Sequence, residues 1–309
     1  MTGTRLAGLD GTNPLGFLGG LGVQVAFAST QPQPRLWWSE DIPPRAMVDD
    51  AFPVDRIVDQ AIPVFREWCQ SAALNPSGPG GVPLPRGDDL KLARGDIRAY
   101  LENVREADPA ALLGTALVAE GSVDNNGSAK PSDLYFTAGQ QKFVAMARRV
   151  LQEVTPEEVR AGLTGPWTYA SKLPSFMWDV IDDRVYALTA INPSDDKKLS
   201  NPGVEALAIL GLCLHPVFGT RGRTLTRGCS GTWKKGHYSW PLWCKPASPD
   251  VVKSLLAHAH GSAVDDRRKW FRSWGVSTVL QTSMRRSSQG GYGTFAPPEI
   301  LWQDNRAPQ

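Results

Sequence analysis

Cysteine and histidine are scarce in this sequence, with four of each in 309 residues. Four cysteines in a chain of this length do not make a disulfide framework, so a reducing, cytoplasmic setting is expected. No apolar run reaches the ~18–20 residues that a membrane-spanning helix needs, and no secretory leader is recognisable. The sequence therefore predicts a cytoplasmic protein that acts without a membrane.

Common catalytic signatures are also missing. The sequence contains neither of the glycine-rich phosphate loops, GxxxxGK[ST] or GxGxxG after a strand, and no GxSxG nucleophile elbow. Five cysteines and histidines that lie near one another in the C-terminal part do not form the local pairs, such as CxxC or HxxxH, that zinc sites use; they are Cys213, His215, Cys229, His237 and Cys244. His258 and His260 are expected on different faces of one helix, where they make a poor ligand pair. We therefore expect no catalytic residue, no metal and no cofactor.

Positive charge is concentrated in the last third of the chain. Residues 1–214 carry 19 Lys and Arg against 26 Asp and Glu, whereas residues 215–309 carry 14 against 5. The net charges are −7 and +9, although the whole chain has only +2. A basic segment of this kind favours a polyanionic partner, nucleic acid being the commonest.

Two loops and several capped helices outline the organisation. A polar stretch at residues 121–132 is the predicted boundary between an N-terminal part, 1–130, and a C-terminal part, 131–309. A helix is predicted after Thr137, with Phe143, Met146 and Val150 facing the core. Another is predicted to begin at Thr155. The expected fold is α+β, with antiparallel sheets and short packed helices.

The dipeptide Asn-Pro occurs twice before a short apolar stretch. Asn13-Pro14 and Asn201-Pro202 each provide an N-cap and a proline suited to the first helical turn. Both stretches are rich in glycine, and we predict that the helices end at or just past Gly22 and Gly211. The glycines favour close packing of each helix on a sheet, with backbone N–H groups facing a phosphate as the alternative.

One basic stretch, "TRGRTLTRGCSGTWKKGHYSW", mixes cations, glycines and aromatic rings. Basic groups neutralise phosphates and aromatic rings stack on bases, so the stretch is a predicted nucleic-acid-binding hairpin. The alternative is an ordinary β-hairpin with core tryptophans and solvated cations. Its candidate contact residues are Arg221, Arg223, Arg227, Trp233, Lys234, Lys235 and Tyr238. Further basic candidates follow in the chain: Arg267, Arg268, Lys269, Arg285 and Arg286.

Five blocks, taken in order, resemble the Csb/Csx-type proteins of type I-G (formerly I-U) CRISPR systems. They are "TNPLGFLGGLGV", "PRLWWSED", "FTAGQQKFVAMA", "SNPGVEALAILGL" and "YSWPLW". The resemblance covers about residues 6 to 245, and it rests on the order of the blocks because none is specific alone.

This resemblance implies a non-catalytic subunit of a Cascade-type effector complex in antiviral defence. Such a subunit binds CRISPR RNA, target DNA or both, together with other effector subunits, and often carries ferredoxin-like (RAMP-like) elements. Two other functions stay open on the sequence alone. One is a nucleic-acid-processing enzyme of the RNA endonuclease type, and the other is a structural scaffold whose basic face binds an acidic subunit.

Overall fold

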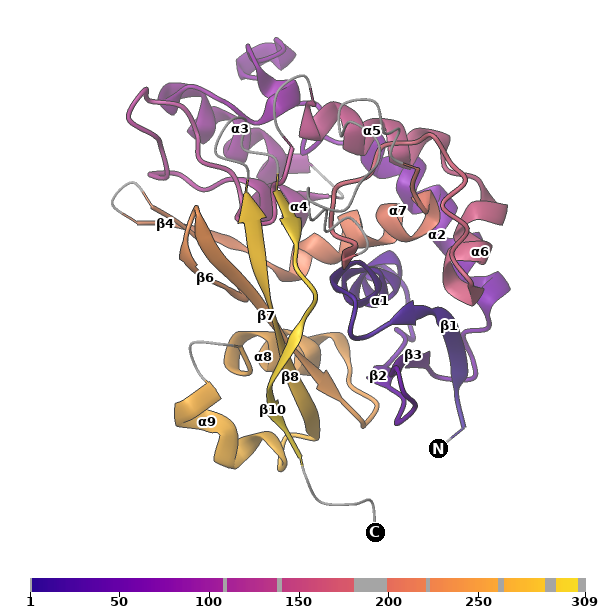
Figure 1. Cartoon of the computed structure of the whole chain (residues 1–309). Helices are drawn as coiled ribbons and strands as arrows, with labels where there is room; N and C mark the ends of the chain where they lie inside the picture. The colour runs from indigo at the N-terminus through magenta and orange to yellow at the C-terminus, as the bar shows by residue number, and fades with distance from the viewer. Residues whose placement is uncertain are drawn as a thin grey trace, which may run out of the picture.

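The computed structural model describes residues 2–107, 110–137, 141–180, 199–220, 223–260, 264–286 and 293–304. Antiparallel sheets and separate runs of helices make up these residues, which confirms the predicted α+β class (Figure 1). All four cysteines are free thiols. In this part of the chain no helix combines the length and the apolar character needed to span a bilayer.

The N-terminal sheet has three short strands in the order β1-β3-β2. They are β1 (Thr4–Asp10), β2 (Leu36–Trp38) and β3 (Arg45–Val48), and both pairings are antiparallel. Helix α1 (Pro14–Ala26) lies in the connection between β1 and β2, which therefore run parallel with β3 between them. This is the arrangement of a split β-α-β unit, the first half of a ferredoxin-like fold. The strand that would complete such a sheet beside β1 is not among the described residues.

Helix α1 packs against β1 and β2, and a group of further helices lies in the upper part of Figure 1. The helices are α2 (Val54–Cys69), α3 (Arg94–Ala107), α4 (Ala111–Leu117), α5 (Phe143–Glu153), α6 (Pro156–Thr164) and α7 (Pro202–Gly211). Short 3-10 turns lie at Pro79–Gly81, Gly87–Asp89 and Leu212–Leu214. Among the described helices, α1 and α7 pack against each other most extensively.

The C-terminal sheet has the strand order β10-β8-β7-β6, with β9 paired to the end of β8. Its strands are β6 (Cys229–Thr232), β7 (Lys235–Trp243), β8 (Val276–Arg286), β9 (Gly293–Phe295) and β10 (Glu299–Gln303). Helices α8 (Pro249–His258) and α9 (Val264–Phe271) connect β7 to β8. A separate hairpin precedes the sheet, formed by β4 (Val217–Thr220) and β5 (Arg223–Thr226).

Both Asn-Pro dipeptides begin helices, as predicted. Pro14 is the first residue of α1, and the Asn13 side chain accepts a hydrogen bond from the Leu15 amide at 3.0 Å. Pro202 begins α7, which ends at Gly211, but the Asn201 side chain does not cap this helix because it accepts a hydrogen bond from the Tyr169 amide instead. The predicted end of α1 is wrong, because the helix continues to Ala26, four residues beyond Gly22.

Glycines allow α1 and α7 to touch backbone to backbone. A Cβ atom added at Gly22 would lie 1.8 Å from the Leu207 carbonyl oxygen, and one at Gly211 would lie 2.2 Å from that of Leu18. No side chain fits at such distances, so both positions require glycine. The sequence predicted that these glycines would pack each helix closely on a sheet. At these two positions the close packing is instead between α1 and α7.

Capping was predicted correctly for one of the next two helices. Thr155 caps α6 through a reciprocal pair of hydrogen bonds with Glu158. Thr137 does not cap α5, because that helix begins at Phe143. Of the predicted core positions of α5, Phe143 and Val150 are buried and Met146 is partly buried.

One hydrophobic core contains buried residues from both predicted parts of the chain. The ring of Phe17 stacks on Trp38 with centroids 5.5 Å apart, and Trp243 lies edge-on to both rings. The Trp243 indole also donates a hydrogen bond to the Leu36 carbonyl at 2.6 Å. Side chains of the N-terminal and C-terminal sheets therefore pack against each other in one core. The division of the chain at residue 130 stays a prediction.

Candidate nucleic-acid interface

The basic, aromatic stretch forms a hairpin between β6 and β7. Thr232 pairs with Lys235, so Trp233 and Lys234 alone make the turn. Gly231 precedes the turn with φ +86°, and a Cβ atom there would lie 2.2 Å from the Lys235 carbonyl oxygen. Glycine adopts this left-handed backbone conformation readily, whereas other residues are strained in it. The glycine therefore shapes the tip that presents Trp233.

Trp233 lies at the tip against a partly buried arginine. The Arg286 guanidinium, at the end of β8, is 3.5 Å from the centroid of the Trp233 ring and 4.9 Å from that of Phe136. It donates hydrogen bonds to the carbonyl oxygens of Tyr135 at 2.9 Å and Asp133 at 2.5 Å. Trp233 nevertheless keeps 47% of its surface exposed. The arrangement holds an exposed aromatic ring over a fixed cation.

The electrostatics of this cluster favour a positively charged Arg286. Burial lowers the pKa of Arg286 to about 10, so the guanidinium stays protonated at neutral pH. Burial also raises the pKa of Asp133, a shift that Arg286 and Arg223 both oppose. Arg223 begins β5, at the end of the separate β4–β5 hairpin, where it is paired with Thr220.

The other candidates around the tip are exposed. Lys234 and Lys235 lie in and beside the turn, Arg223 begins β5, and Arg285 precedes the partly buried Arg286 on β8. Gly236 of β7 is paired with Met284 of β8, which brings the end of β8 to the start of the hairpin. Arg221 lies outside the described residues. Lys234 and Lys235 therefore flank Trp233, whereas Arg285 alternates with Arg286 along β8 and projects from the opposite face of that strand.

The basic residues of α9 lie at the opposite end of the sheet. Trp243 is paired with Val276 where β8 begins, just after α9, so α9 is about 30 Å from the tip along the strands. Figure 1 shows α9 at the bottom and the end of β8 at the top. Arg267 donates a hydrogen bond to His258, and Lys269 lies 5.5 Å from the Trp270 ring centroid. Arg267, Arg268 and Lys269 form a separate group.

Tyr238 is a core residue, so its predicted role in stacking on a base is wrong. Its side chain is fully buried, its ring stacks on Trp240 at 5.1 Å, and its hydroxyl is 2.9 Å from His215 Nε2. Tyr238, Trp240 and Leu242 alternate along β7 and face the core together. This period of two was the signal in the sequence that distinguished Tyr238 from Trp233.

Two arginines also differ from the solvated phosphate ligands that were predicted. Arg227 is half-buried and donates to the Leu214 carbonyl at 3.4 Å. Arg286 is enclosed by two rings and bonded to two carbonyl groups, so it supports Trp233 rather than reaching solvent. Phe136, the ring on its far side, was missed because it lies about a hundred residues from the hairpin in the sequence.

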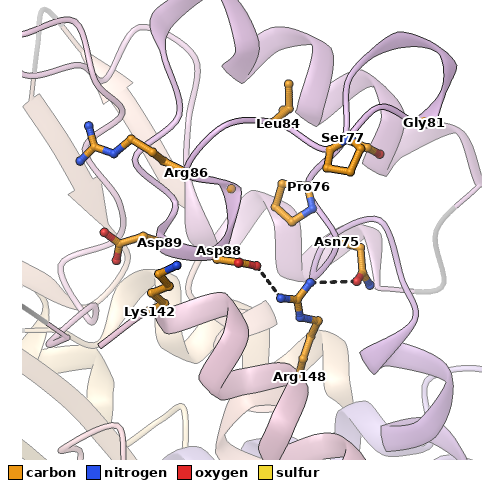
Figure 2. A pocket seen from close by; sticks show the side chains of 12 residues that line it. Asn75, Pro76, Ser77, Gly81, Leu84, Arg86, Asp88, Asp89, Lys142 and Arg148 are labelled. Carbon is orange, nitrogen blue, oxygen red and sulfur yellow. Dashed lines mark hydrogen bonds and ion pairs between the residues drawn. The ribbon is translucent and has the colours of Figure 1, made fainter. Parts of the chain in front are cut away.

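A cavity of about 500 Å³ lies elsewhere, between α5 and the loop that precedes α3. Figure 2 shows Arg148 between Asp88 and Asn75, to both of which it is bonded, and Lys142 beside the two aspartates. Asp89 is paired with Lys91 at 2.6 Å and accepts a hydrogen bond from Tyr135. Both aspartates of this cavity are engaged in ion pairs, with Arg148 and with Lys91, which favours a structural role for them.

No cluster of three or more potential metal ligands occurs within the described ranges. A comparison with models of known protein families and a search of curated proteins both found no match to this sequence.

Proposed function

We propose that this protein binds single-stranded nucleic acid through the β6–β7 hairpin, as a non-catalytic subunit of an RNA-guided CRISPR effector complex. The observation that carries the proposal is the exposed Trp233 ring, held over Arg286 and flanked by exposed lysines. The ordered sequence blocks that resemble type I-G subunits support the complex as its setting. Its partners are then CRISPR RNA, target DNA and the other effector subunits.

The chemistry of the tip suits a flexible single strand. A base stacks on the open part of the Trp233 ring, while Lys234, Lys235 and Arg223 neutralise neighbouring phosphates. Stacking accepts any base, and phosphate contacts carry no sequence information. Sequence specificity in such a complex comes from pairing between guide and target, with the protein reading backbone and shape.

Charge reversal tests this proposal directly. The measurement is the fluorescence anisotropy of a labelled single strand of about ten nucleotides, RNA and DNA in turn, at several salt concentrations. Arg223→Glu combined with Lys234→Glu should weaken binding and flatten its dependence on log salt by about 0.7 for each lost phosphate contact.

The matched control reverses two exposed cations away from the tip, Arg160→Glu on α6 with Lys253→Glu on α8 (Figure 1). It should bind like the parent protein. Equal affinity and equal salt slope in the hairpin variant and the parent would overturn the proposal.

The complex provides a second test. The chain is purified together with the proteins encoded beside it, and bound RNA is extracted. A complex that contains RNA only when the hairpin is intact supports the proposal. Assembly that is free of RNA and insensitive to salt would instead indicate a structural scaffold, and metal-dependent cleavage of the strand would indicate an enzyme.

A further inference from the structure

A second cleft lies on the side of the molecule away from the hairpin, between β1 and the segment that follows α6. Its volume is about 440 Å³. Figure 1 shows β1 and α6 at the right of the molecule and β6 at the left. The residues that carry the argument are Asp10, Asn13, Arg45, Trp167 and Tyr169, all of which line the cleft. Its size falls within the range of small-molecule sites.

Two aromatic rings of the cleft are held in fixed orientations. The Trp167 indole donates a hydrogen bond to the Gly162 carbonyl at 3.1 Å, and the Tyr169 hydroxyl donates to Asp179 at 2.7 Å. The ring centroids are 6.5 Å apart and the planes form an angle of 76°. Both side chains are only partly buried. The cleft therefore presents prearranged aromatic surface.

Both Asn-Pro helix starts hold Tyr169 in place. Its amide donates to the Asn201 side chain at 3.3 Å, and the Asp179 carboxylate that binds its hydroxyl also accepts from Asn13 at 2.8 Å. Tyr169 has φ +49°, a left-handed conformation that is costly for a bulky side chain. Such strain persists only where the surroundings impose it, and it is common at binding sites.

Opposite charges face this aromatic surface without neutralising each other. Asp10 and Arg45 are paired across β1 and β3, so their side chains emerge next to each other. Within the described residues, neither takes part in an ion pair. One Asp10 oxygen accepts from the amide and hydroxyl of Thr12, which fixes the carboxylate. A guanidinium and an oriented carboxylate are thus both available to one ligand.

We propose that this cleft binds a single nucleotide. The base stacks on Trp167, the Arg45 guanidinium binds the phosphate, and the free oxygen of Asp10 accepts a hydrogen bond from a ribose hydroxyl or a base amino group. A nucleotide combines the planar ring, the anion and the hydrogen-bond donors that these three side chains require. The inference does not rest on the proposed function, because no residue of the hairpin takes part.

The experiment uses the full chain with Trp233→Ala and Lys234→Glu, so that neither the stacking ring nor the turn lysine of the hairpin contributes. Isothermal titration calorimetry is run with adenosine 5′-monophosphate, with adenosine, with ribose 5-phosphate, and with a 5′-phosphorylated tetranucleotide. Binding of the monophosphate indicates a free nucleotide, and binding of the tetranucleotide alone indicates a nucleotide at the end of a strand. Either result supports the site if it depends on the cleft residues.

Arg45→Gln and Trp167→Ala should each weaken the observed binding by about ten-fold or more, the size expected from loss of a stacking or phosphate contact. Adenosine and ribose 5-phosphate should each bind more weakly than the complete nucleotide. The control is Arg5→Gln, which removes an exposed cation of β1 that pairs with Asp41. Thermal melting verifies that each variant is folded.

The absence of binding by all four ligands at millimolar concentration would overturn the proposal. Binding that is unchanged in a folded Arg45→Gln variant and a folded Trp167→Ala variant would also overturn it. Neither result affects the hairpin, whose own test compares the parent protein with the Arg223→Glu, Lys234→Glu variant and uses a longer strand.

Discussion

The Arg286 guanidinium lies 3.5 Å from the centroid of the Trp233 ring, although 53 positions separate the two residues in the sequence. The arginine is largely enclosed and bonded to two backbone carbonyl groups, whereas the tryptophan keeps about half of its surface exposed. Arg286 therefore has a structural role, whereas Trp233 is accessible to a ligand. Mutation of Arg286 should mainly lower stability, and mutation of Trp233 should mainly weaken binding.

Trp233→Ala should weaken binding of a short single strand by about 1–3 kcal/mol, the usual contribution of a stacked base. Its melting temperature should change little because the ring is half exposed. Trp270→Ala is the matched control, since it removes an equally exposed ring at the far end of the sheet. Anisotropy and thermal melting of both variants check this. A large loss of stability with unchanged affinity would mean that Trp233 is only a structural residue.

Gly22→Ala and Gly211→Ala should each destabilise the protein by about 3 kcal/mol, because the new methyl group forces α1 and α7 apart. Gly95→Ala is the control, because it lies in α3 with no atom within 4 Å of the added Cβ. That variant should be as stable as the parent or more stable by about 0.5 kcal/mol. Urea denaturation of all three measures the difference. Similar free energies of unfolding for Gly22→Ala and Gly95→Ala would contradict the close contact.

Burial of His215 should make the protein sensitive to acid. Burial lowers the pKa of His215 to about 4, so the side chain is neutral in the folded state down to that pH. The unfolded chain binds the proton at its ordinary pKa of about 6.5. Stability is therefore fully present above about pH 6.5 and is lost as the pH falls toward 4, by up to about 3 kcal/mol.

The measurement is the free energy of unfolding between these two pH values, for the parent and for His215→Gln. The variant should be less stable at neutral pH, where the Tyr238 hydroxyl loses its partner, and should show a shallower decline. Parallel declines in both proteins would show that His215 does not cause the effect.

Phe143→Ala should cost about 3–5 kcal/mol, the loss of transfer free energy together with the cavity that remains. The ring is buried and lies 5.3 Å from the Tyr135 ring and 5.0 Å from the Phe176 ring. Arg149→Ala changes an exposed position of the same helix and should cost less than about 1 kcal/mol. Melting of the Phe143→Ala variant at the temperature of the parent would refute this packing.

The sequence by itself determined the local starts of three helices. Asn13, Asn201 and Thr155 each precede a proline, whose fixed φ acts within a single turn, and the side chains of Asn13 and Thr155 also cap their helices, whereas that of Asn201 does not. The α+β class could also be predicted from the sequence, because short helical and short extended segments each have their own local pattern of apolar residues. The end of α1 could not be predicted from the sequence, because Gly22 makes room for the backbone of α7, which is remote in sequence, and does not end its own helix.

The sites were decided by tertiary structure. Trp233 and Tyr238 belong to the same basic, aromatic stretch, yet pairing of β7 with β8 buries Tyr238 and leaves Trp233 at the turn. The nucleotide cleft unites Asp10, Arg45 and Trp167 from three distant segments. Contacts of this kind arise from the packing of sheets and helices, where burial outweighs local preference. Composition therefore revealed which side chains were available, and only the folded chain determined which of them face solvent together.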